Sequence, residues 1–69
     1  MIGERLRELR KNKGLSQQKL SDILGLTKSA VSLYEKNKTE PNDKIKIIIA
    51  KYFDISVDYL IGVIDEEIS

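Results

Sequence analysis

Residues 17–36 read QQKLSDILGLTKSAVSLYEK, and this stretch decides the fold. Two short helical segments, at 17–24 and 28–36, are expected on either side of Gly25-Leu26-Thr27, which has the length of a tight corner between helices. Gly25 lets the chain reverse with positive φ, and Thr27 is the expected N-cap of the second segment. The stretch therefore predicts a helix-turn-helix.

The segment 28–36 is expected to have one inward face and one outward face. Its apolar residues recur at spacings of three and four, so they should pack against the first segment. The outward side chains are short and mostly polar, so this helix is slim enough to enter the major groove of a duplex. The expected core residues of the two segments are Leu20, Ile23, Leu24, Leu26, Val31 and Tyr34. The expected outward residues are Lys28, Ser29, Ser32, Leu33 and Lys36.

Three further helical segments are indicated by the period of their apolar residues, and they complete an all-α, five-helix bundle. The isoleucine-rich run at 45–49 would suit a strand by β-propensity alone. However, Ile45, Ile49 and Phe53 recur at the four-residue spacing of one helix face, which favours a helix. The three segments are expected at 2–13, 43–53 and 57–61.

Most of the helix boundaries carry residues that are typical of caps. Serine, threonine and asparagine precede helices because their side chains accept from unpaired amides of the first turn. Pro41 prevents a helix from running through the connection at 37–42. The expected N-caps are Ser16, Thr27, Asn42 and Ser56. Positive φ is expected at Gly14, Gly25 and Asn37, and Gly62 should end the last segment.

The composition argues against several classes of function. The 69 residues include no cysteine and no histidine, which removes the commonest metal ligands and the commonest general base. No apolar run approaches the roughly 20 residues that span a bilayer, and the first residues do not read as a signal segment. We therefore expect a cytoplasmic protein that is not an enzyme, with no metal, cofactor, small-molecule ligand or membrane partner.

The charge is distributed unevenly along the chain. Residues 1–46 contain eleven basic and six acidic side chains, giving +5, whereas 47–69 set Lys51 against five acidic side chains, giving −4. A basic region suits a surface that meets a polyanion, although an ordinary solvated surface would have the same composition. We expect a domain at 1–62 followed by a short acidic C-terminal tail at 63–69.

Several different short motifs follow one another along the chain. They are Arg5-Leu6-Arg7-Glu8-Leu9-Arg10, Gly14-Leu15-Ser16-Gln17, Leu20-Ser21, Gly25-Leu26, Ser29-Ala30-Val31-Ser32-Leu33-Tyr34-Glu35, Lys38, Pro41, Ala50 and Ser56-Val57-Asp58-Tyr59-Leu60. In this order and spacing they resemble the Cro and lambdoid phage repressor class of helix-turn-helix proteins, also called XRE-like. The resemblance covers about Ile2 to Gly62, and it implies a compact five-helix DNA-binding domain.

The outward residues of the segment 28–36 are the expected contacts with base edges. Ser29 and Ser32 can both donate and accept, so they discriminate only weakly among bases. Leu33 either meets a thymine methyl or folds back over the domain surface. Lys28 either donates to guanine or meets the DNA backbone. The predicted base-contacting set is Lys28, Ser29, Ser32 and Leu33.

The resemblance also implies contacts with phosphates. In the family, the residue that matches Gln17 contacts a phosphate and often braces a side chain of the reading helix. The loop after that helix meets the DNA backbone, partly through main-chain N–H groups. Thr27 should cap its helix, bind a phosphate, or do both. The predicted phosphate-contacting set is Gln17, Thr27, Lys36, Asn37, Lys38 and Thr39.

Two structural roles follow from the same resemblance. Arg10 and Glu35 match the family's buried ion pair, which orients the reading helix without touching bases. The C-terminal end of the domain matches a two-fold interface, which would place two reading helices about 34 Å apart on a palindromic site; alternatively, these residues close the monomer core around Phe53. The predicted interface set is Val57, Tyr59, Leu60, Ile61, Val63 and Ile64.

The sequence therefore predicts a sequence-specific DNA-binding transcriptional regulator, a repressor that acts as a homodimer on double-stranded DNA. The alternative is a protein-interaction module, such as an antitoxin or an anti-repressor, that retains the fold. The near-neutral net charge of +1 gives the alternative some support. The small, polar outward face of segment 28–36 argues against protein binding as the sole role.

Overall fold

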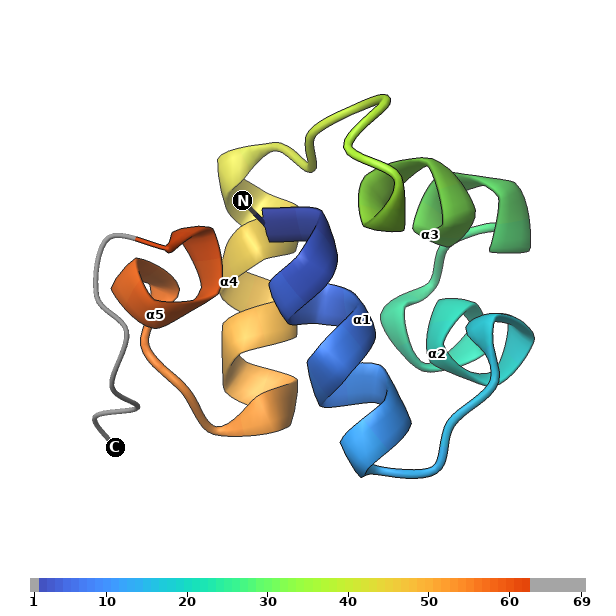
Figure 1. Ribbon diagram of the computed structural model, residues 1–69, viewed down its shortest axis with the longest axis horizontal. Coiled ribbons are helices and arrows are strands. Elements are labelled where there is room, and N and C mark those ends of the chain that lie inside the picture. The colour runs from blue at the N-terminus through green and yellow to red at the C-terminus, as the bar shows by residue number, and fades with distance from the viewer. Residues whose placement is uncertain (1, 63–69) are drawn as a thin grey trace.

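The computed structural model describes residues 2–62, and five helices with no strand make up this part of the chain. In Figure 1, α1 lies at the centre, with α4 and α5 on one side and α2 and α3 on the other. The predicted all-α bundle is confirmed, and every helix boundary lies within one residue of its expected position. The helices are α1 (Ile2–Asn12), α2 (Gln17–Leu24), α3 (Lys28–Glu35), α4 (Asp43–Phe53) and α5 (Val57–Ile61).

The four predicted N-caps are confirmed at the starts of α2, α3, α4 and α5. In each case the cap residue has an extended backbone, and its side-chain oxygen accepts the amide of the third helical residue. These bonds satisfy one of the unpaired donors at each helix start. The cap-to-amide distances are 3.0 Å for Ser16, 3.1 Å for Thr27, 2.9 Å for Asn42 and 3.0 Å for Ser56.

The helix ends also follow the sequence, with one addition. The positive φ predicted for Asn37 is observed at 58°, and the predicted glycines adopt it as well. Asp54, for which we made no such prediction, ends α4 with φ of 56°. Aspartate and asparagine tolerate this region because their short polar side chains bond locally.

The core lies between the five helices, each of which contributes at least one buried apolar residue. Ile23 was expected in this core but is 38% exposed, so that prediction is wrong. Successive residues of a helix are rotated by about 100° around its axis. The buried face of α2 includes Ser21, which is fully buried, and it therefore leaves Ile23 toward the solvent. The buried apolar residues are Ile2, Leu6, Leu20, Leu24, Val31, Ile49, Ala50, Phe53, Ile55 and Leu60.

The first turn of α1 lies directly against the end of α3. A Cβ atom added to Gly3 would lie 2.6 Å from the Tyr34 carbonyl oxygen and 2.7 Å from that of Glu35. Both atoms are backbone, so they cannot move aside without shifting a helix. The close approach therefore requires glycine at this position.

We expect Gly3→Ala to lower the free energy of unfolding by about 1–3 kcal/mol, because the added methyl group overpacks the contact between α1 and α3. Chemical denaturation followed by circular dichroism measures the change. Glu8→Ala, at an exposed position of the same helix, should stay within about 0.5 kcal/mol of the wild type. A Gly3→Ala variant as stable as the wild type would contradict the close approach.

Candidate nucleic-acid interface

The first turns of α2 and α3 border a shallow open depression on the protein surface. Both helices begin at the right of the view in Figure 1. Five residues line the depression, and all belong to the predicted contact sets: Gln17, Lys28, Ser29, Ser32 and Leu33. The fold thus brings the four predicted base contacts together with one predicted phosphate contact.

The outward face of α3 is accessible along its length. Lys28 and Ser29 are exposed, and Ser32 is half-buried. Leu33 is 40% exposed, an unusual position for a leucine side chain within this small domain. Val31, which is fully buried, anchors the opposite face in the core. The helix is therefore supported from behind while its small polar side chains remain available to a ligand.

A buried polar network fixes the orientation of α3. Arg10 Nε and Nη2 donate to the two carboxylate oxygens of Glu35 at 2.6 and 3.1 Å, and Arg10 Nη1 donates to the Leu15 carbonyl at 2.7 Å. The side chains of Arg10 and Glu35 are only 11% and 4% exposed. This is the ion pair that the resemblance implied, in the bidentate geometry that makes such pairs strong. No buried side-chain nitrogen or oxygen among residues 2–62 lacks a hydrogen-bond partner.

Gln17 belongs to the same network. Its Nε2 donates to Glu35 Oε1 at 3.1 Å, so the first residue of α2 braces the last residue of α3. Since a primary amide has two N–H donors and a carbonyl acceptor, hydrogen-bonding capacity remains at the depression that Gln17 lines. The network therefore holds the two helix starts in a fixed relation while leaving Gln17 able to bind a further group.

The loop after α3 uses its main-chain amides internally. The N–H groups of Lys36, Asn37 and Lys38 donate to carbonyls of α3 at 3.1, 3.1 and 3.0 Å. These bonds close the helix end, as is typical when a residue of positive φ follows it. The main-chain N–H groups of these three residues are therefore engaged within the protein, and the ammonium groups of Lys36 and Lys38 are the exposed donors beside them.

The side chain of Asn37 is also engaged within the protein. Its Oδ1 accepts the Gly3 amide at 3.0 Å, and its Nδ2 donates to the Glu4 carboxylate. The hydrogen bond from Asn37 lowers the pKa of the Glu4 carboxyl below its ordinary value, since it favours the charged form. Sequence reasoning missed this contact, because nothing in the spacing of the chain relates Asn37 to residues 3 and 4.

The residues predicted for a subunit interface are divided between core and surface. Leu60 is fully buried in the domain, so its side chain presents no surface to a partner. Val57, Tyr59 and Ile61 are half-buried, and the Arg5 guanidinium lies 4.0 Å from the centre of the Tyr59 ring. Val63 and Ile64 lie outside the described residues, as does the predicted tail 63–69.

Two further findings concern other kinds of site in the described part of the chain. No helix within residues 2–62 has both the length and the apolar character needed to cross a membrane. The acidic side chains of this range form no group of three that could hold a metal ion.

Comparisons with known proteins agree with this architecture. The family model described as helix-turn-helix matches residues 6–60. The Bacillus subtilis protein YqaE, an uncharacterized HTH-type transcriptional regulator, is 43% identical over 88% of this chain and 53% of its own length. The chain spans 53–59% of the length of this relative and of two other curated regulators of Bacillus subtilis that it matches, YobD and YonR.

Solved structures include similar domains bound to DNA. The c2 repressor of Salmonella phage P22, in complex with a synthetic operator, superposes with a TM-score of 0.82 at 35% identity and covers 87% of this chain and 91% of its own. SinR, a master regulator for biofilm formation, was solved in complex with DNA. It gives a TM-score of 0.79 at 34% identity over 88% of this chain and 98% of its own.

Proposed function

Because this chain belongs to the helix-turn-helix family of the Cro and phage repressor type, we propose that it is a DNA-binding transcriptional regulator that acts as a repressor in the cytoplasm. The observation that carries the proposal is the open depression at the starts of α2 and α3. The P22 c2 repressor and SinR, which share this fold, were solved with DNA. A regulator with no enzymatic activity requires only such a surface and a means of orienting it.

The exposed face of α3 is the proposed reader of base edges. Lys28, near the helix start, would donate to guanine or to a phosphate, and Ser29 and Ser32 would bond base edges. The exposed Leu33 side chain suits a thymine methyl group. The face carries no bulky aromatic or acidic side chain that would oppose entry into the major groove.

The phosphate contacts are proposed for side chains around this face. Thr27 Oγ1 accepts the Ala30 amide as a cap, but the hydroxyl retains a proton to donate to a phosphate. Gln17 keeps a second amide N–H for the same purpose. Lys36, Lys38 and Thr39 follow α3 and are exposed, so they would meet the backbone at the other end of the helix.

A homodimer on a palindromic operator is the proposed binding unit. Val57, Tyr59 and Ile61 supply the partly exposed apolar surface at the C-terminal end of the described domain. A two-fold contact there would present two copies of α3 to successive major grooves, about 34 Å apart.

Selection of bound duplexes from a random-sequence pool tests the proposal. We expect an enriched palindrome whose two half-sites are separated by about one helical turn, or 10 base pairs. Failure to retain any duplex at low salt would overturn the regulator function and favour a protein-binding module. An enriched site without two-fold symmetry would retain DNA binding but overturn the proposed dimer.

Lys36→Gln and Lys38→Gln should each weaken binding by a similar factor on specific and unrelated duplexes, because phosphate contacts carry no sequence information. Each substitution should also reduce the slope of log affinity against log salt concentration by about 0.9 for each operator half-site occupied. Titrations of labelled duplexes at several salt concentrations measure this slope. An unchanged slope would remove the lysine in question from the contact set.

A further inference from the structure

We propose that Asn37 is a positioning residue that fastens the α3–α4 loop to the first turn of α1 and presets Lys38 and Thr39 for the DNA backbone. This inference rests on the proposed function, since it concerns how the loop of that same interface is held. The two hydrogen bonds from Asn37 to Gly3 and Glu4 are called the clasp below.

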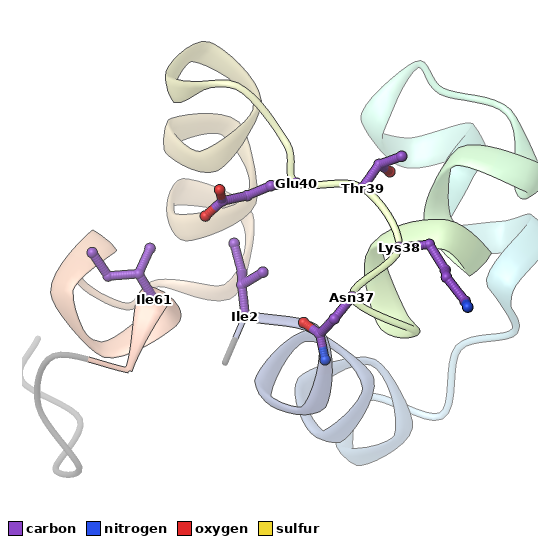
Figure 2. A pocket seen from close by; sticks show the side chains of 6 residues that line it. All are labelled: Ile2, Asn37, Lys38, Thr39, Glu40 and Ile61. Carbon is purple, nitrogen blue, oxygen red and sulfur yellow. The ribbon is translucent and has the colours of Figure 1, made fainter.

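The clasp uses both functional groups of one side-chain amide. Oδ1 accepts the Gly3 N–H at 3.0 Å, and Nδ2 donates to the Glu4 carboxylate. The first N–H groups of a helix have no partner within the helix, and Asn37 supplies an acceptor for one of them at the start of α1. The side chain is turned toward α1, as Figure 2 shows, and its hydrogen bonds are made within the protein.

The backbone of Asn37 and its side chain make separable contributions. A φ of 58° lets the amide N–H groups of Asn37 and Lys38 close the end of α3. Glycine would adopt the same φ with no steric cost and would keep these backbone bonds. The clasp, by contrast, depends on the carboxamide alone, so a substitution by glycine removes the clasp while the turn can still form its own backbone bonds.

The loop beyond Asn37 has little packing behind it. An open pocket of about 290 Å³ is lined by residues 37–40 and by Ile2 and Ile61. In Figure 2 the Lys38 and Thr39 side chains point away from these two isoleucines. At its far end the loop is held by the buried Pro41 and by an ion pair of 3.3 Å between Lys46 and Glu40, whose side chain is 68% exposed. A pair that is open to solvent on one side contributes little.

The clasp therefore ties the loop to α1, in addition to the backbone bonds that close the end of α3, and it steadies Lys38 and Thr39. Ordering a flexible segment at the moment of binding costs free energy, and a segment already held in its bound position avoids that cost. Without the clasp, one or two side chains would have to be ordered when the DNA binds. The expected loss of affinity is about 3- to 10-fold.

The test measures affinity for the duplex selected by the wild-type protein, at a temperature where circular dichroism shows every variant folded. Asn37→Gly should bind about 3- to 10-fold more weakly. The amide of Lys38, which donates to the Leu33 carbonyl, should exchange with solvent faster in this variant, since a turn that is no longer fastened to α1 opens more often. Glu4→Gln should stay close to the wild type, because the glutamine carbonyl still accepts from Asn37 Nδ2.

A pair of exchanged residues separates positioning from a direct phosphate contact. Asn37→Asp alone places two carboxylates against each other and should weaken binding. Adding Glu4→Gln rebuilds the clasp with donor and acceptor reversed, at the same net charge as the wild type. The double variant should recover to within about threefold of the wild-type affinity, as coupled residues do.

Three outcomes would overturn the clasp. They are an Asn37→Gly variant that binds as well as the wild type, unchanged amide exchange in the loop, and a double variant no better than Asn37→Asp. The last of these would instead indicate that Asn37 itself touches a phosphate, which an aspartate would repel. If the wild-type protein binds no duplex at all, it is the proposed function that fails.

Discussion

Arg10→Met is expected to lower the free energy of unfolding by about 3–5 kcal/mol, the cost of leaving one member of a buried ion pair alone. Removing the guanidinium leaves the Glu35 carboxylate, 4% exposed, with the Gln17 amide as its remaining side-chain donor. The Leu15 carbonyl loses its bond to Arg10 as well. A domain of this size is stable by roughly 5 kcal/mol, so the variant should be close to unfolded.

Urea denaturation followed by far-ultraviolet circular dichroism measures the loss. Lys11→Met is the matched control, because it removes the same charge from the next residue of α1, which is exposed. The control should change stability by no more than about 0.5 kcal/mol. Equal midpoints for the two variants would contradict a stabilising role for the pair.

Arg10→Lys extends the test to a variant that keeps the charge. Lysine cannot reproduce the two parallel bonds to Glu35 together with the bond to the Leu15 carbonyl. Its stability should therefore lie between those of the wild type and Arg10→Met. If Arg10→Met does not fold, the free energies of unfolding of Arg10→Lys and the wild type can still be compared.

The helix boundaries could be predicted because the signals that set them are local. A cap such as Ser16 bonds an amide only three residues away, and Asn37 has positive φ, a region that asparagine adopts more readily than most residues. Asp54 adopts the same backbone region. It went unpredicted because aspartate is also common on exposed helix surfaces, so its presence alone does not mark an end.

Burial was harder to predict because it depends on partners far along the chain. Ile23 has the apolar side chain expected of a core residue, yet Ser21 occupies the fully buried position. Only the angle at which α2 meets its neighbours decides between them. Leu60 raises the same difficulty, since the sequence does not reveal whether an apolar residue of the short α5 faces its own core or a partner.

In the candidate site, too, groupings along one helix could be predicted from the sequence, whereas contacts between distant residues could not be predicted from spacing. The residues of the depression share one face of α3, so helical spacing alone grouped Lys28, Ser29, Ser32 and Leu33. The ion pair between Arg10 and Glu35 came from the family resemblance and not from spacing. The clasp joins residues 34 positions apart, and no periodic signal relates them, so only the folded chain brings them together.

Ser29→Glu is expected to uncouple stability from DNA binding. Ser29 is the second residue of α3, whose first turn has no acidic side chain. A carboxylate near a helix start interacts favourably with the helix dipole, so stability should rise by about 0.3–1 kcal/mol. On DNA, the same carboxylate would lie among base acceptors and phosphates. Affinity should therefore fall about 100-fold, the upper range for loss of one specific contact.

Thermal unfolding and duplex titration on the same preparations measure the two effects. Ser29→Gln has nearly the same size without the charge, and its smaller loss of affinity separates steric from electrostatic effects. Lys51→Gln lowers the net charge by the same amount on the last turn of α4, away from the proposed interface. At physiological salt its effect should be screened to less than about threefold. A Ser29→Glu protein that still binds its selected duplex within that factor would place α3 outside the groove, because no buried interface tolerates an unpaired carboxylate facing phosphates at so small a cost.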